Sequence, residues 1–147
     1  MKASRKPRKK KKLFTPAEAN AALPLVTAIV QDIAALAKSL HERQERLARL
    51  GPSNRGGLSE AYREELQQVQ TELERDDDRM REYIQELSDL GIELKDPFTG
   101  LIDFPASING RDVYLCWRMG EAEVAYWHEL EAGFAGRQKL KVPAGSN

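Results

Sequence analysis

The chain has 147 residues, of which 41% are hydrophobic and 31% are charged. This composition is typical of a soluble globular protein, and the length suits a single domain. We expect no membrane partner, because no apolar run approaches the ~20 residues that cross a bilayer. The one cysteine excludes an internal disulfide, and the basic N-terminus runs into a helix start rather than an apolar leader. The expected compartment is therefore the cytoplasm.

The formal net charge is zero, but the charges are unevenly distributed. Residues 1–12 hold eight Lys and Arg and no acid, which leaves a formal charge of −8 on the remainder. Such a segment buries little surface, so we predict a disordered basic tail over residues 1–12. Two interpretations remain: an arm that binds nucleic-acid phosphates, or a leader that folds over the acidic body. Nucleic acid, if bound, is expected through this tail alone.

A first helix is predicted from a capping box. Thr15 and Glu18 can satisfy each other's backbone amides, and Pro16 occupies the first helical position. Pro24 should kink this helix or split it. Apolar residues then recur at helical spacing up to the Gly-Pro pair at 51–52, at Val26, Ile29, Ile33, Leu36, Leu40, Leu47 and Leu50.

A second helix is predicted after a glycine-rich loop at 51–58, with Ser59 as its cap and Gly91 at its end. Its seam alternates steps of four and three residues, as in coiled coils: Tyr62, Leu66, Val69, Leu73, Asp76, Met80, Tyr83, Leu87 and Leu90. Asp76 is either an inward carboxylate or a solvated one beside an arginine. Together the helices form an antiparallel hairpin over 13–91. Two helices cannot cover all of their own apolar surface, so the remaining cover comes from the C-terminal sheet or from a second copy that completes a four-helix bundle. We favour the homodimer.

The pair Asn109–Gly110 predicts a two-residue type I′ turn and hence a β-hairpin. Counting outward places Ile108 opposite Arg111. The next pairs on the same face are apolar: Ala106 with Val113, Phe104 with Leu115, and Ile102 with Trp117. The opposite face then pairs Asp103 with Cys116.

A second turn at Met119–Gly120 extends the predicted meander. Pairing Arg118 with Glu121 places Glu123 beside Cys116 and Tyr126 beside Val113. The resulting polar face is the candidate binding face: Asp103, Cys116, Arg118, Glu121, Glu123, His128 and Arg137. The loop 133–137 either holds an anion with Arg137, or closes the fold with Phe134 filling the core and Arg137 paired with Glu121 or Glu131.

Four residues of this face are metal-ligand types: Asp103, Cys116, Glu123 and His128. They favour a zinc or iron site. The alternative is a half-exposed polar face that contains a small buried thiol.

The predicted fold class is α+β, with a long antiparallel helical hairpin, kinked at Pro24, followed by a small antiparallel β-meander. One domain is expected over 13–140, with the hairpin at 13–91, the meander and closing loop at 92–137, and a disordered end at 141–147.

Several segments resemble a bacterial family of unknown function, DUF2203. The resemblance covers roughly residues 13–140 and rests on FTPAEAN at 14–20, GIELKD at 91–96, GLIDFPA at 100–106, LCWRMGE at 115–121, YWHE at 126–129 and GFAGR at 133–137. It implies a small bacterial protein and names no substrate.

Three functions follow as hypotheses. The first is a non-enzymatic binding module that uses the polar sheet face and the Gly/Arg loop. The second is a metal-binding protein or metal-dependent enzyme, and the third is nucleic-acid association through the tail. No recognised catalytic set is present in the sequence, which favours the first, non-enzymatic hypothesis over the second and leaves the question of enzymatic activity open.

Overall fold

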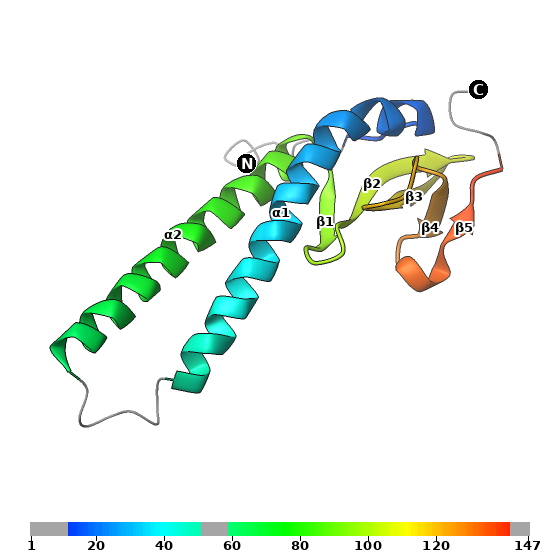
Figure 1. Cartoon of the computed structure of the whole chain (residues 1–147). Helices are drawn as coiled ribbons and strands as arrows, with labels where there is room; N and C mark the ends of the chain where they lie inside the picture. Colours follow the sequence, from blue (N-terminus) through cyan, green and yellow to red (C-terminus); the bar gives the residue numbers. More distant parts are fainter. Residues whose placement is uncertain (1–11, 51–58, 142–147) are drawn as a thin grey trace, which may run out of the picture.

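The structure, a computed structural model, describes residues 12–50 and 59–141. It is an α+β fold in which two long helices precede a five-stranded antiparallel sheet of order β1-β2-β3-β4-β5 (Figure 1). The elements are α1 (Pro16–Leu50), α2 (Glu60–Asp89), β1 (Glu93–Asp96), β2 (Leu101–Ile108), β3 (Arg111–Arg118), β4 (Tyr126–Glu129), the short helix η3 (Phe134–Gly136) and β5 (Gln138–Lys139). The predicted fold class is confirmed. Residues 1–11 of the expected tail at 1–12, the loop at 51–58, and residues 142–147 of the expected end at 141–147 lie outside the described residues.

Helix α1 begins at the predicted capping box. The Thr15 amide donates to Glu18 Oε1 at 3.0 Å, and the Glu18 amide donates to Thr15 Oγ1 at 3.1 Å. The helix continues through Pro24 and is not split there. Figure 1 shows it changing direction within its N-terminal part, as expected where a proline removes a helical hydrogen bond.

Helix α2 has the predicted cap at each end. The Ser59 side chain accepts a hydrogen bond from the Tyr62 amide at 3.1 Å. After the helix, Gly91 has a φ of +89°, and the Ile92 amide turns back to the Leu87 carbonyl at 3.0 Å. This geometry satisfies carbonyls that the helix end would otherwise leave free.

Asp76 joins the two helices. It forms an ion pair with Arg43 of α1 and a second with Arg79, one turn along α2. Its hydrogen bond with Arg43 is the main cause that lowers the pKa of this carboxyl. The sequence left open whether Asp76 points inward or is solvated, and it lies at the edge of the helix interface.

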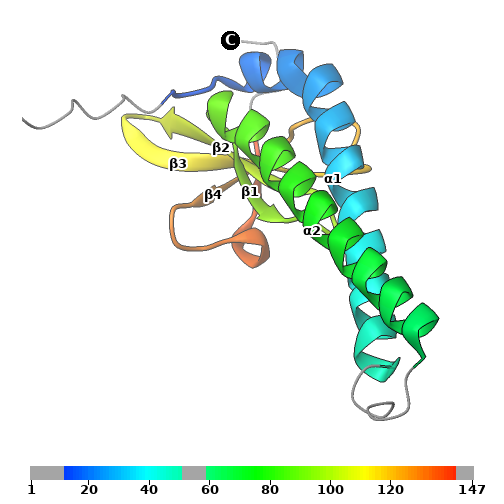
Figure 2. The same cartoon turned by 90° about the vertical axis from the view of Figure 1, so that its left-hand side faces the viewer.

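The main core lies between one face of the sheet and the adjoining end of the hairpin (Figures 1 and 2). From the hairpin it includes Val26, Val30, Ile33 and Leu87, and from the sheet Ile102, Phe104, Val113, Leu115 and Trp117. A smaller cluster of Leu36, Leu40 and Leu73 follows along the hairpin. Beyond it, both helices project past the sheet.

Helix α1 contains a long apolar window. An 18-residue window within Pro16–Arg49 has a mean hydropathy of 1.5, and 33% of that window is buried. By length and composition alone the helix could cross a membrane, although core helices of soluble proteins meet the same criterion. The expectation that no apolar stretch approaches spanning length is therefore wrong for α1. The absence of a membrane partner stays a prediction.

The first β-hairpin has the predicted register in full. Strands β2 and β3 pair antiparallel from Ile108 opposite Arg111 to Leu101 opposite Arg118. Asn109 and Gly110 have φ angles of +52° and +79°, as a type I′ turn requires. Asp103 consequently lies opposite Cys116, on the face turned away from the helices.

The second predicted register is wrong. Strand β4 pairs with β3 so that Tyr126 lies opposite Cys116 and His128 opposite Tyr114, a shift of three residues. After the turn at Met119–Gly120 the chain leaves the sheet, because Asn20 of α1 holds the Val124 backbone. Asn20 Oδ1 accepts from the Val124 amide at 2.7 Å, and its Nδ2 donates to the Val124 carbonyl at 3.2 Å.

Gly100 offers a test of the packing between sheet and hairpin. It has a φ of +70°, and a Cβ there would lie 2.6 Å from Val30 Cγ1 and 2.7 Å from Met119 Cβ. Gly110 has a similar φ of +79° with nothing within 4 Å. We expect Gly100→Ala to lower the free energy of unfolding by about 3 kcal/mol, through strain and overpacking, and Gly110→Ala by about 1 kcal/mol, through strain alone. Urea unfolding of the two variants measures the difference, and equal losses would contradict this packing.

Candidate metal centre

Three polar side chains from neighbouring strands meet on the sheet face turned away from the helices. Asp103 of β2, Cys116 of β3 and His128 of β4 place their ligand atoms all within 4.8 Å of one another. His128 Nε2 lies 3.1 Å from Asp103 Oδ1 and 3.0 Å from Oδ2. The residues are 2%, 0% and 2% exposed, respectively, so this group is enclosed and not half-exposed.

The shift of β4 decides which residues join this group. Side chains alternate between the two faces of a strand, so a shift by an odd number of residues exchanges the faces. In the predicted register Glu123 stood beside Cys116. In the structure Glu123 is exposed in the connection before β4, outside the group, and His128 turns toward Asp103 instead.

The other predicted face residues form a cover beside the group. Arg137 holds both carboxylate oxygens of Glu121, at 3.1 and 2.7 Å, and stacks on the Tyr126 ring at 3.9 Å. Its Nη1 lies 4.0 Å from Cys116 Sγ. Arg118 and Arg137 both stack on Phe134. The closing-loop interpretation, with Arg137 paired to Glu121, fits this arrangement, whereas Phe134 is 39% exposed and does not fill the core.

A second cover, on the other side of His128, was not predicted. The Tyr114 ring lies 5.5 Å from the His128 ring, and its hydroxyl donates to Glu93 at 2.9 Å. Burial, together with the Glu93 carboxylate, raises the pKa of Tyr114 to about 12. Glu93 belongs to β1, which lies opposite Asp103. The alternating residues of ELKD at 93–96 were the only sequence signal for this strand.

Both ring nitrogens of His128 face oxygen acceptors. Nδ1 lies 2.7 Å from the Glu129 carbonyl, and Nε2 faces the Asp103 carboxylate. A neutral imidazole carries one proton and can donate at one nitrogen only. If that proton lies on Nδ1, a contact between Nε2 and the carboxylate needs something shared between them, either a second proton or a metal ion.

Burial dominates the acid–base behaviour of the other two side chains. Desolvation raises the pKa of Asp103, although its hydrogen bond to His128 opposes that shift. Desolvation and the neighbouring Asp103 raise the pKa of the Cys116 thiol to about 12, with Arg137 opposing. Without a metal, Cys116 is accordingly a protonated thiol near neutral pH.

The family of the chain is clear from its sequence. A model of the family DUF2203, described as an uncharacterized conserved protein, matches residues 12–140. The chain belongs to this family. Comparisons with curated proteins and with solved structures gave no match. The predicted resemblance is thus confirmed, and the family description carries no activity.

Metal-free protein should have an unreactive thiol. Cys116 is 0% exposed and its pKa is raised to about 12, so both access and thiolate are lacking. In the presence of a chelator, we expect a thiol-specific chromogenic reagent to modify Cys116 only as fast as the protein unfolds. Addition of denaturant should release one rapidly reacting thiol per chain. Rapid reaction of the native protein would contradict the enclosed site.

Proposed function

We propose that this protein is a non-enzymatic metal-binding module that holds one zinc ion between Asp103, Cys116 and His128. The observation that carries the proposal is the convergence of a carboxylate, a thiol and an imidazole in one buried group. These are the oxygen, sulfur and nitrogen ligands that zinc takes in proteins. Glu123, which the sequence suggested as a further ligand, has no part in the proposal.

The distances between His128 and Asp103 suit a shared ion. Zinc bonds of about 2.0–2.1 Å to nitrogen and 2.0–2.2 Å to oxygen hold those two ligand atoms roughly 3.3 Å apart. The 3.0 and 3.1 Å between His128 Nε2 and the two Asp103 oxygens are close to that separation. A single hydrogen bond would need only one short distance from Nε2 to the carboxylate. Nearly equal distances to both carboxylate oxygens suit an imidazole and a carboxylate that face a shared ion.

The surroundings of the ligands support the same proposal. His128 can donate from Nδ1 to the Glu129 carbonyl, which leaves the Nε2 lone pair free for the metal. A backbone carbonyl that orients a ligating histidine in this way is a common feature of zinc sites. A divalent ion with one carboxylate and one thiolate is neutral, and the adjoining Arg137–Glu121 pair is neutral as well. Burial of the site then leaves no net charge uncompensated.

Three protein ligands leave the fourth tetrahedral position of the ion to water or another small ligand. All three residues are buried, which keeps that position away from bulk solvent and favours a structural role for the ion over a catalytic one. Catalytic zinc sites keep a coordination position open to substrate, whereas structural sites are closed. Asp103, Cys116 and His128 lie on three consecutive strands and beneath Tyr114, Tyr126 and Arg137. An ion bonded to all three would cross-link β2, β3 and β4.

The other two hypotheses gain less support. A binding module that presents the polar face would need free groups there, but its three central residues are buried and its Arg137 is engaged with Glu121. Nucleic-acid binding through the tail concerns residues 1–12, of which 1–11 lie outside the described part of the chain, and it stays a prediction.

Elemental analysis tests the proposal directly. Protein purified without a metal-affinity tag and incubated with zinc should retain about one zinc per chain after gel filtration. We expect Cys116→Ser and Asp103→Asn to reduce the retained metal to a small fraction. Glu123→Gln is the matched control, because this exposed carboxylate was suggested by the sequence but lies outside the group, and it should retain zinc fully.

Cobalt substitution identifies the ligands. A cobalt(II) complex of the wild-type protein should show a thiolate-to-metal charge-transfer band, which Cys116→Ser abolishes and Glu123→Gln preserves. Less than roughly 0.1 metal per chain in the wild-type protein would overturn the proposal and leave a hydrogen-bonded Asp–His pair. Binding of iron in place of zinc would support the site but would change the identity of its metal.

The affinity for zinc should fall as the pH is lowered. The pKa of Cys116 is raised to about 12, so the metal must displace the thiol proton throughout the neutral range. Each displaced proton makes the affinity fall about tenfold per pH unit. Competition with a chromophoric chelator between about pH 6 and 8 measures this slope, which should be smaller by about one proton in Cys116→Ser. An affinity that does not change with pH would contradict a thiolate ligand.

A further inference from the structure

Among the described residues, the free end of the hairpin lacks the cover that its other end receives from the sheet. The main core ends near Ile33 on α1 and Met80 on α2, and the smaller cluster of Leu36, Leu40 and Leu73 follows. Farther along, the seam residues Leu47 and Val69 are only partly buried. Figures 1 and 2 show this part of the hairpin beyond the sheet.

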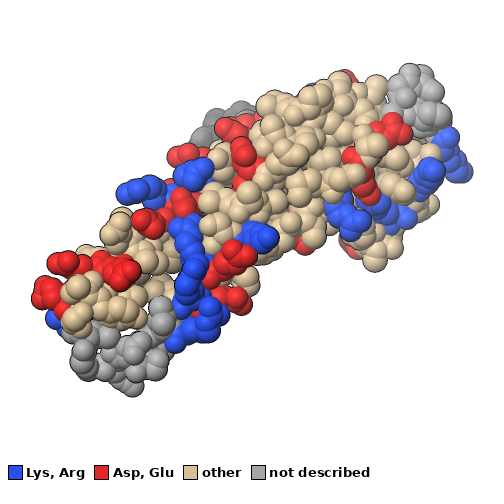
Figure 3. Space-filling view, in the orientation of Figure 1, with Lys and Arg blue, Asp and Glu red and all other residues tan. Residues whose placement is uncertain are grey.

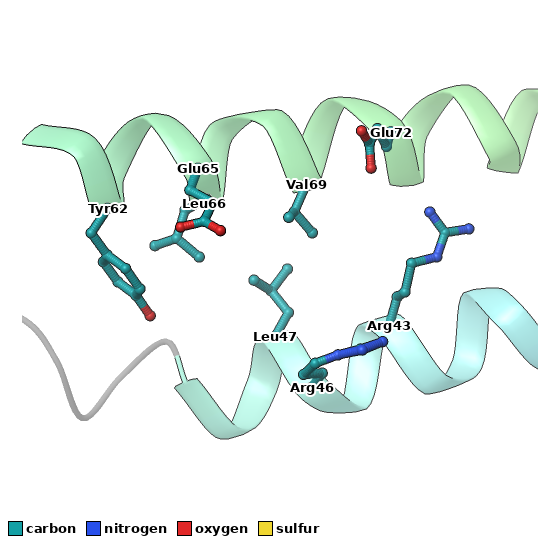
Figure 4. A pocket seen from close by; sticks show the side chains of 8 residues that line it. All are labelled: Arg43, Arg46, Leu47, Tyr62, Glu65, Leu66, Val69 and Glu72. Carbon is teal, nitrogen blue, oxygen red and sulfur yellow. The ribbon is translucent and has the colours of Figure 1, made fainter.

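A gap separates the two helices at this end. It has a volume of about 310 Å³ and lies between α1 and α2 (Figure 4). Its apolar lining is formed by Leu47, Tyr62, Leu66 and Val69, with Arg43, Arg46, Glu65 and Glu72 around them. The Tyr62 hydroxyl is buried and has no hydrogen-bond partner among the described residues. The gap opens to solvent, so the apolar side chains that line it lack the close packing of a protein interior on that side.

The sequence pattern agrees with a larger bundle. Tyr62, Leu66, Val69 and Leu73 continue the steps of four and three residues that characterise coiled coils and four-helix bundles. Of these four, only Leu73 is buried. A seam that repeats as regularly here as at the sheet end predicts that this part of α2 is buried too.

The charges of the two helices indicate which partner fits. Over residues 38–49, α1 has four basic and two acidic residues, a formal +2. Over residues 60–78, α2 has eight acidic and two basic residues, a formal −6. Figure 3 shows basic side chains along the free end of α1 and acidic side chains beside them on α2. A second hairpin that places its α1 on this α2 brings opposite charges together twice, which is the self-complementarity of a twofold dimer.

We propose that the free ends of two hairpins pack into an antiparallel four-helix bundle, with α1 of each copy against α2 of the other. Apolar side chains of the second copy fill the gap around Leu66 and Val69. The alternative self-association surface is the outer face of α1 near the sheet, where Leu25 is 56% exposed. That face lacks the opposite charges that distinguish the free end.

The oligomeric state of the full chain and matched variants tests this proposal. Sedimentation equilibrium from about 1 to 200 µM should show a wild-type dimer that weakens in high salt. Leu66→Glu places a charge in the gap and should give a monomer, and Arg46→Glu, on the exposed rim, should weaken dimerisation at least tenfold. Leu25→Glu adds the same charge to the other face and should remain dimeric.

Circular dichroism and thermal unfolding of each variant verify that the monomer is folded. Because Arg46 is exposed, its variant keeps the test valid if Leu66→Glu fails to fold. A monomeric wild-type protein at all concentrations overturns the proposal, as does a Leu25→Glu monomer beside a Leu66→Glu dimer. Cys116→Ser should dimerise like the wild-type protein, so a failure of the metal site leaves this result unaffected.

Discussion

The pairing of β2 with β3 is the constraint on which the rest of the structure depends. The Asn109–Gly110 turn requires two consecutive residues of positive φ, a conformation that asparagine and glycine adopt with the least strain. Once the turn forms, alternation sends Phe104 and Trp117 toward the helices and Cys116 away from them. A slip by one residue would bury the polar set in the core and expose the aromatic rings. Strands β1 and β4 then add to the two edges of this hairpin.

The candidate metal centre arises from two independent positioning events. The β2–β3 register brings Asp103 and Cys116 together, and the attachment of Val124 to Asn20 delays β4 until His128 reaches the same place. Each burial of a polar group is unfavourable unless a partner compensates it. Here the partners are mutual, and a bound ion would satisfy all three side chains at once. The geometry of the site therefore depends both on the register of the strands and on the hydrogen bonds between α1 and the Val124 backbone.

The helical hairpin divides into two parts with different surroundings. At one end its apolar residues contact the sheet and form most of the core, and at the other end they face a gap between the helices. Asp76 and its two arginines lie between these parts and hold the helices together across the boundary. The proposed ion and the proposed second copy therefore act on opposite ends of the molecule, one on the sheet and the other on the projecting helices.

Local chemistry in the sequence determined the helices, their caps and the first β-hairpin. The capping box at Thr15, the end of α2 at Gly91 and the Asn109–Gly110 turn each depend on residues within a few positions of one another, so the pattern is readable along the chain. The register of β4 is different, because it depends on a side chain 104 residues away in sequence. Only the tertiary structure could remove Glu123 from the predicted set and bring His128 to Asp103, since local alternation continues a meander and has no information about where a distant helix will hold the backbone.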